Sequence, residues 1–335
     1  MPSDSAETQD ALQLLRDVLA SRPDRPAGPL TLSARSLKGG LTANLLCVSA
    51  RTNEGRLEQF VLKRLPDRAR QEARAYAALA RCGLSHIGPR LLATPSRGGT
   101  RYLLLEFVPR WKTWPWRDEA YAGMVLDTLA RLHAAPLPAR WRADSPLQQT
   151  SALAACYTCD LLCRAAAASG EGRLRRGVRV VEALAARLPE ARARLHHTPV
   201  FLHGDVHPGN VFIRAEEGRR RAVLVDWGRS RLGSRFEDVA SWLQCLRYFE
   251  RATIAAHDRL LLRYVRAAGL GDRITAALRR EYWMAAGSNG LAGALGVHLS
   301  RMLTAKTAGR RDAALAAAVD WLRIIRRAAA YLDAE

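Results

Sequence analysis

The segment HGDVHPGN, residues 203–210, is the part of this sequence that decides its fold. It places Asp205 two residues after His203 and five residues before Asn210, in the spacing H-x-D-x-x-x-x-N. The Pro-Gly pair before Asn210 favours a turn. The spacing therefore predicts a tight loop that presents Asp205 and Asn210 together, with His203 and His207 as its supporting residues.

A third polar side chain, Asp226, ends an apolar run sixteen residues after Asn210. Strand-like segments over 200–213 and 221–227 flank a turn, which predicts a β-hairpin that carries Asp205, Asn210 and Asp226. A carboxylate at the end of a buried strand is suited to hold Mg²⁺, which prefers oxygen ligands. Asp-Trp-Gly alone is common turn chemistry, but the three side chains at these spacings indicate a catalytic site.

The N-terminal part of the chain supplies a candidate cation. Lys63 ends an apolar run, and only 4 of the 52 basic residues are Lys, so this position is expected to require Lys. Glu72 follows nine residues later, in a stretch with helical character. Phosphoryl transfer needs an oriented nucleophile, Mg²⁺ and a cation on the phosphates. We expect Lys63 to be that cation and Glu72 to hold it by an ion pair.

Two further stretches are expected to contact a nucleotide through their backbone. Gly39 and Gly40 lie between two expected strands, where a chain without side chains can approach phosphate closely. Glu106 and Val108 follow a buried strand, and their backbone groups are expected to bond adenine. The patterns GxGxxG and GxxxxGK[ST] do not occur, which excludes the dinucleotide-binding fold and the phosphate-binding loop of the nucleoside triphosphatases.

The order of elements predicts an α+β fold in two lobes. After a helix over residues 6–21, the sequence predicts five strands and one inserted helix, over 67–81, and then mostly helices. We therefore expect a nucleotide-binding lobe with a five-stranded antiparallel sheet over residues 1–108. Residues 109–335 are expected to form a helical lobe with the catalytic β-hairpin and the substrate site, and the cleft is expected between the lobes.

Composition narrows the range of partners. The net charge of +20 is spread along the chain, without a basic block longer than three residues, so we expect no nucleic-acid partner. No apolar stretch reaches the roughly 18 residues of a membrane span, and the N-terminus lacks the features of a signal peptide. We expect a cytoplasmic protein without a membrane partner.

Seven stretches of the chain occur in the order of one known family: GGLTAN (39–44), VLK (61–63), QEARAY (71–76), LLLEFVP (103–109), LARLHA (129–134), HGDVHPGNVFI (203–213) and LVDWGRSRLGSRFEDVASWL (224–243). On these motifs the sequence resembles the aminoglycoside phosphotransferase and choline kinase superfamily, distant relatives of protein kinases. The resemblance implies a bilobal protein-kinase-like fold and transfer of the γ-phosphate of ATP to a hydroxyl group. It implies Asp205 as catalytic base, Asn210 and Asp226 as Mg²⁺ ligands, and Lys63 with its partner Glu72 as the phosphate cation.

Some positions depart from the patterns of these families. Asn44 lies one residue later than in the pattern GGxxN, so the pattern does not assign it a contact to the phosphate loop. Only twelve residues separate Asp226 from Asp238, which matches the structural aspartate of the family, and no Ala-Pro-Glu follows. A regulated activation segment has no room there, so the expected acceptor is a small molecule and not a protein.

The sequence leaves the acceptor open. From residue 240 onward it has eight acidic residues against fifteen basic ones, which disfavours a polycationic aminoglycoside; neutral or anionic hydroxyl compounds fit the charge at least as well. Aromatic residues that could cage a quaternary ammonium group are present, but at helical spacing they are expected in the core: Trp242, Tyr248, Tyr282 and Trp283. An antibiotic, an amino sugar or an amino alcohol all remain candidates. The alternatives are a choline- or ethanolamine-type kinase and a non-catalytic, pseudokinase-like binding protein.

Overall fold

A computed structural model describes residues 4–20, 30–37, 45–52, 55–65, 70–110, 113–136, 147–195, 198–216 and 218–332. The chain forms two compact units. The first comprises Met1–Lys112 and Phe212–Arg229, and the second comprises Thr113–Val211 and Ser230–Glu335.

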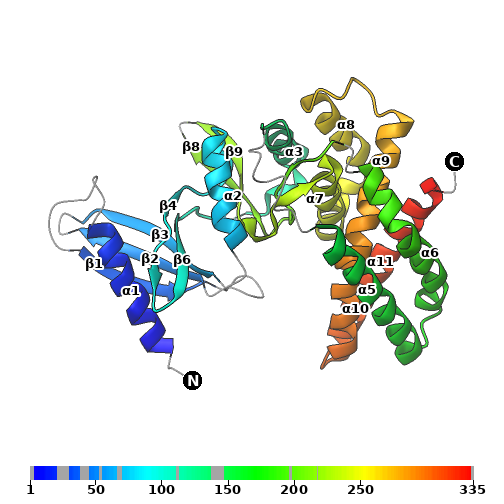
Figure 1. The fold of residues 1–335 in the computed structure, drawn as a ribbon, viewed down its shortest axis with the longest axis horizontal. Coiled ribbons are helices and arrows are strands. Elements are labelled where there is room, and N and C mark those ends of the chain that lie inside the picture. Colours follow the sequence, from blue (N-terminus) through cyan, green and yellow to red (C-terminus); the bar gives the residue numbers. More distant parts are fainter. Residues whose placement is uncertain are drawn as a thin grey trace. The chain divides into compact units, whose positions relative to one another are not determined.

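An antiparallel sheet forms the body of the first unit (Figure 1). In sheet order its strands are β1 (Leu30–Ser36), β2 (Leu45–Thr52), β3 (Leu57–Leu65), β6 (Thr100–Glu106) and β4 (Leu91–Ala93), and β5 (Ser96–Arg97) pairs with β6. The prediction of five strands is one short, because β5 and β6 form a hairpin that the sequence shows only as a turn. Gly98 and Gly99 both have positive φ, at 55° and 77°, as a two-residue hairpin turn requires.

The helix α1 (Asp4–Ala20) packs on one face of this sheet, where the sequence predicts a helix over 6–21. Its Leu15 and Leu19 share an apolar cluster with Phe60 and Leu62 of β3. Side chains alternate between the faces of a strand, so Lys63 points to the opposite face. The helix α2 (Arg70–Arg81) begins five residues after β3 ends.

The β-hairpin formed by β8 (Val211–Glu216) and β9 (Arg219–Leu224) lies with the first unit, whereas the sequence predicts it in the helical lobe. Its packing explains the difference. Arg214 forms an ion pair with Glu106 at 2.9 Å, and the fully buried indole of Trp227 lies against Tyr76, with ring centroids 6.5 Å apart. The predicted strand over 200–213 is split, because β7 (Val200–Leu202) pairs with β10 (Arg231–Gly233) in the second unit.

The second unit is mostly helical. Its longer helices are α3 (Glu119–His133), α5 (Leu147–Ser169), α6 (Gly172–Leu195), α7 (Arg235–Phe249), α8 (His257–Ala267), α9 (Ala276–Asn289), α10 (Leu295–Thr304) and α11 (Ala308–Leu332). Helix α11 packs against α6, α9 and α10, and α3 packs against α8. The predicted core position is confirmed for Trp242, Tyr282 and Trp283, which are at most 2% exposed. It is wrong for Tyr248, which lies at the end of α7 and is 40% exposed.

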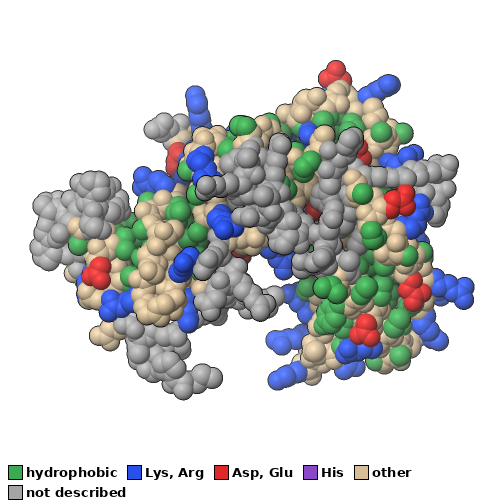
Figure 2. Space-filling view, in the orientation of Figure 1, with side chains coloured by type: hydrophobic (Ala, Val, Ile, Leu, Met, Phe, Trp, Pro, Cys, Tyr) green, Lys and Arg blue, Asp and Glu red, His purple; other side chains and the backbone are tan. Residues whose placement is uncertain are grey.

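Charged side chains are dispersed over the described surface. On the face shown in Figure 2, Lys and Arg are interspersed with acidic and apolar side chains, without a continuous basic band. Among the described residues, none of the helices combines the length and apolar character that a bilayer crossing needs.

Candidate active site

The first unit brings together three of the predicted site residues. Lys63 Nζ lies 2.7 Å from Glu72 Oε2 and 2.7 Å from Asp226 Oδ1. Lys63 sits in the middle of the sheet, opposite Leu45 of β2 and Leu103 of β6, and Glu72 lies in the first turn of α2. One ammonium group therefore connects the central strand, the helix and the chain that follows the β-hairpin.

Burial and charge set the protonation of this cluster. Lys63 and Glu72 are 7% and 1% exposed. Burial by itself lowers the pKa of Lys63, but the two carboxylates outweigh it and hold that pKa above its usual value. Burial raises the pKa of Glu72 despite the neighbouring Lys63. One ammonium shared by two carboxylates explains the direction for Lys63, burial explains the direction for Glu72, and the cluster has a net charge of −1 when all three groups are ionised.

Asp226 has an unusual backbone conformation. Its φ is 65°, and it is the only described residue other than glycine with positive φ. This conformation costs an L-residue about 1–2 kcal/mol, so the surroundings must hold it in place. The next residue, Trp227, is fully buried and donates its indole N–H to the carbonyl of Leu224 at 2.9 Å. The side chain of Asp226 remains 44% exposed beside Lys63.

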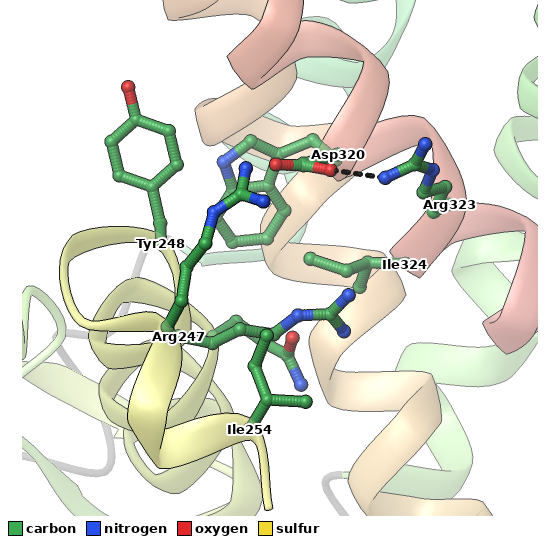
Figure 3. A pocket seen from close by; sticks show the side chains of 9 residues that line it. Arg247, Tyr248, Ile254, Asp320, Arg323 and Ile324 are labelled. Carbon is green, nitrogen blue, oxygen red and sulfur yellow. Dashed lines mark hydrogen bonds and ion pairs between the residues drawn. The ribbon is translucent and has the colours of Figure 1, made fainter.

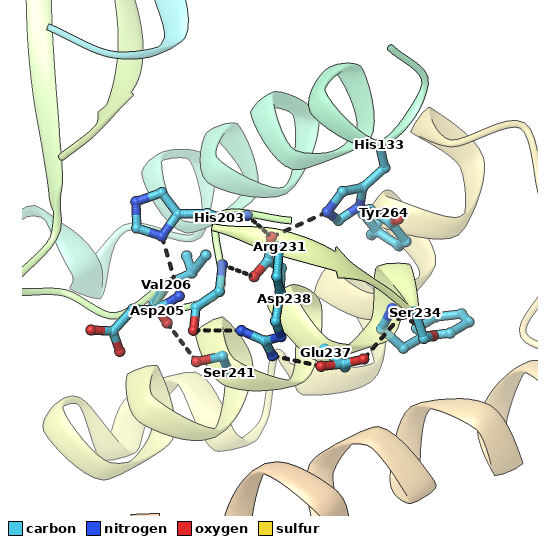
Figure 4. Close-up of polar contacts among 12 residues, drawn as sticks. His133, His203, Asp205, Val206, Arg231, Ser234, Glu237, Asp238, Ser241 and Tyr264 are labelled. Carbon is cyan, nitrogen blue, oxygen red and sulfur yellow. Dashed lines mark hydrogen bonds and ion pairs between the residues drawn. The ribbon is translucent and has the colours of Figure 1, made fainter. Parts of the chain in front are cut away.

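The second unit holds the loop over residues 203–210, and one buried carboxylate organises its start (Figure 4). Asp238 accepts hydrogen bonds from the backbone N–H of His203 at 2.7 Å and of Gly204 at 2.8 Å. Gly204 has a φ of 83°, which favours glycine at this position. In the sequence, Asp238 matches only the structural aspartate of the family. In the structure it fixes the main chain directly before Asp205.

Side chains within the loop complete its shape. His203 Nδ1 accepts from the backbone N–H of Asp205 at 3.3 Å, and His207 Nδ1 accepts from that of Gly209 at 3.0 Å. The side-chain amide of Asn210 donates to the backbone carbonyl of Asp205 at 3.1 Å. Asp205 and Asn210 are therefore joined in this unit, and both histidines contact the loop backbone.

The sequence did not reveal a second layer of support, formed by Arg231, Glu237 and Ser241. Arg231 donates to the carbonyl of Gly204 at 3.1 Å and forms an ion pair with Glu237 at 2.5 Å (Figure 4). Ser241 of α7 donates to the carbonyl of Val206 at 3.0 Å. The sequence S-x-x-E over 234–237 does signal the start of α7, because these residues form a capping box, but not the link to Arg231.

His133 and Tyr264 lie behind Asp238. His133 Nε2 is 3.3 Å from Asp238 Oδ2, and His133 Nδ1 is 2.7 Å from the hydroxyl of Tyr264. Burial by itself raises the pKa of Asp238, but His133, with His203 and Arg231 close by, lowers it below its usual value. The stretch LARLHA contains His133, so the sequence marks the position without giving its partner.

The remaining predicted site residues take different places. The Glu106 side chain accepts from the backbone N–H of Arg90 at 3.1 Å and pairs with Arg214, and Val108 is buried. Gly39 and Gly40 lie outside the described residues, as does Asn44.

A fold made of an antiparallel sheet unit and a helical unit, with a Lys–Glu–Asp cluster and an H-x-D-x-x-x-x-N loop, has the parts of a small-molecule kinase. The family model of the phosphotransferase enzyme family (APH) matches residues 48–282, and the chain belongs to this family. This confirms the resemblance found in the sequence and the predicted class of small-molecule phosphotransferase. Among curated proteins, no sequence matches the chain.

Solved structures with the same fold include kinases of amino alcohols and of antibiotics. The choline kinase from Cryptosporidium parvum Iowa II is 12% identical with a TM-score of 0.66, covering 98% of this chain and 99% of its own. The Plasmodium vivax ethanolamine kinase is 11% identical with a TM-score of 0.61, covering 90% and 84%. Spectinomycin phosphotransferase, solved with ADP and spectinomycin, is 12% identical with a TM-score of 0.59, covering 89% and 93%. These likenesses confirm the predicted fold class.

Proposed function

We propose that this protein transfers the γ-phosphoryl group of Mg-ATP to a hydroxyl group of a small molecule, with Asp205 as the catalytic base. The observation that carries the proposal is the way the main chain around Asp205 is held. Bonds fix the N–H groups of residues 203–205 and the carbonyl groups of residues 204–206. Such a fixed backbone orients one side chain, which is what general base catalysis requires.

The residues also suit a magnesium ion. The Asn210 amide donates its NH₂ group to Asp205, so its carbonyl oxygen is the atom left for a cation. Asp226 adds an exposed carboxylate from a cluster with an excess negative charge. No described His, Cys, Asp or Glu side chains form a group of three that could hold a metal by themselves. An amide oxygen and a carboxylate oxygen are both ligands that Mg²⁺ takes beside the phosphate oxygens of a nucleotide, so each residue fits the role that the sequence predicts for it.

The other proposed roles are those that the sequence predicts. Lys63, held by Glu72, would contact the non-transferred phosphates, and the backbone of Glu106 and Val108 would bond adenine. Gly39 and Gly40 would approach the phosphates through their N–H groups. Asp205 accepts the proton of the acceptor hydroxyl. The oxygen of that hydroxyl bonds to the γ-phosphorus, and ADP leaves with the bridging oxygen. We place this activity in the cytoplasm, as the sequence predicts.

The test is ADP formation from Mg-ATP with a panel of hydroxyl compounds, in the parent and in Asp205→Asn. The variant keeps the size of the side chain and loses the base, so we expect turnover to fall about a hundredfold or more. Asp272→Asn, an exposed aspartate of the same unit, is the matched control and is expected to keep parental turnover. Parental turnover in Asp205→Asn contradicts the assignment of the base. ATP binding without any ADP formation in the parent would instead indicate a non-catalytic binding protein.

A further inference from the structure

A pocket of about 60 Å³ opens between the C-terminal part of α7, the short helix after it (Arg251–Ile254) and α11, within the second unit (Figure 3). Tyr248 and Trp321 supply aromatic walls, and Ile254 and Ile324 supply aliphatic ones. Apolar walls with a few placed polar groups are the usual composition of small-molecule sites.

The charged lining of this pocket is mostly positive. It contains three arginines, Arg247, Arg251 and Arg323, and one acidic residue, Asp320. Arg323 and Asp320 neutralise each other through an ion pair at 2.7 Å (Figure 3). Arg247 and Arg251 have no hydrogen-bond or carboxylate partner among the described residues, so two positive charges remain for a ligand.

Gln244 supplies an independent sign of a ligand. Its side chain lines the pocket and is 2% exposed, and its Oε1 has no hydrogen-bond partner within the described part of the chain. The Nε2 of the same amide donates to the hydroxyl of Tyr282 at 2.6 Å, and that hydroxyl lies 2.8 Å from His257 Nε2. A buried acceptor without a donor is costly, so a hydroxyl or amine group beside Oε1 would stabilise this side chain.

Helix α7 links the pocket to the loop that holds Asp205. Ser241 contacts the loop through the carbonyl of Val206, and Gln244 follows three residues later, about 5 Å along the helix. Cys245 lies next to Gln244, and its pKa is raised to about 12 by burial and then by the negative charge of Asp205. Gln244, which lines the pocket, therefore lies within one helical turn of a residue that contacts the catalytic loop.

We propose that this pocket binds the acceptor of the reaction through an anionic group, a carboxylate or a phosphate, held by Arg247 and Arg251, while a hydroxyl or amine donates to Gln244. The inference rests on the proposed function and names its substrate class: hydroxylated acids. A polycationic acceptor would meet two uncompensated arginines and only one carboxylate, which Arg323 already occupies.

Three compounds with the same sugar ring test the charge preference directly. Glucuronate is anionic, glucose is neutral and glucosamine is cationic; titration calorimetry without nucleotide measures the binding of each. We expect glucuronate to bind the parent at least about tenfold more tightly than glucosamine, and high salt to weaken glucuronate most. Equal affinities for the three compounds, or no binding of any of them, would overturn the inference.

Variants locate the effect in the pocket. Arg247→Gln and, separately, Arg251→Gln are each expected to weaken glucuronate about tenfold or more while glucose changes by less than about twofold. Arg247→Lys is expected to keep part of the preference, because it keeps the charge. Arg310→Gln, in α11 but outside the pocket, is the matched control. Parental glucuronate binding in both glutamine variants refutes the inference.

The two proposals fail in different ways. ADP formation in the parent and its loss in Asp205→Asn concern the proposed function alone. A parent that separates glucuronate from glucosamine through Arg247 but forms no ADP refutes the function and leaves the anion pocket standing. A parent that forms ADP equally well with glucuronate and glucosamine refutes the anionic acceptor and leaves the kinase standing.

Discussion

The two polar clusters of this protein are built on opposite principles. In the first unit, Lys63, Glu72 and Asp226 hold one another through side-chain charges. In the second unit, the carboxylate of Asp238 holds the backbone of the loop directly before Asp205. Pairing of charges fixes the ammonium group of Lys63, whereas hydrogen bonds to the backbone orient Asp205, the residue proposed as the base.

This difference determines which substitutions each cluster can accept without a loss of stability. A charge pair loses its balance when one partner is removed, and removal of the second partner can restore it. Backbone N–H groups that point at a buried carboxylate need an acceptor of the same shape. Substitutions in the two clusters test this difference.

Lys63→Met is expected to have the largest effect on stability. It leaves the buried Glu72 without its cation, which typically costs about 3–5 kcal/mol in unfolding free energy. Because the loss is one of charge balance, Lys63→Met with Glu72→Leu is expected to be more stable than Lys63→Met alone. Urea unfolding measures both, with Arg81→Ala on the exposed side of α2 as control. A double variant as unstable as Lys63→Met alone would contradict the view that charge balance stabilises this cluster.

Asp238→Asn is expected to cost about 2–4 kcal/mol, since an amide offers one acceptor oxygen to two backbone N–H groups and turns its NH₂ against one of them. No second substitution of a charged neighbour is expected to restore it. Turnover should fall together with stability, because the loop that carries Asp205 loosens. Unfolding and ADP formation measure the two effects; a variant rescued by His133→Leu would show that charge pairing, and not backbone bonding, is what matters here.

Ser241→Ala removes a single bond to the loop, the one to the carbonyl of Val206. We expect a loss of about 0.5–1.5 kcal/mol in unfolding free energy. Turnover should fall less than about tenfold, because the other bonds around Asp205 remain. Thermal unfolding and steady-state kinetics check both values, with Ser241→Thr as the variant that keeps the hydroxyl. An effect as large as that of Asp238→Asn would contradict a graded network.

The pH dependence is expected to differ in sign between the two clusters. The pKa of Asp238 is lowered by folding, so its contribution is present above about pH 4 and is lost as the pH falls through the folded value. The pKa of Glu72 is raised, so the parent regains stability as the pH falls from 7 through that value.

Urea unfolding between pH 7 and pH 3 shows these signs as differences from the parent. The advantage of the parent over Asp238→Asn should shrink at the acid end, while the parent should gain relative to Glu72→Gln. The same trend for both variants would contradict the expected difference in sign between the two clusters.

Site residues that interact over a short distance along the chain could be predicted from the sequence, and those with distant partners could not. The spacing H-x-D-x-x-x-x-N predicts the loop, because the bonds from Asn210 and His203 to Asp205 span five residues or fewer. Lys63 and Glu72 were also paired from sequence, since a strand followed closely by a helix leaves few arrangements. The contacts of Arg231 and Ser241 were not predicted, because the residues next to them in the sequence do not show which backbone carbonyl each one reaches.

The family, the order of elements and the residues suited to phosphoryl transfer could be predicted from the sequence, because spacing and residue type are local properties. The structure was needed to show that the β-hairpin lies with the sheet unit, that Asp238 holds the loop and that Arg247 and Arg251 line a pocket. These features depend on contacts between segments far apart in the chain, such as Asp238 and His133 across 105 residues. Such contacts depend on which faces of the helices and strands pack together, and the pattern of neighbouring residues in the sequence does not specify this packing.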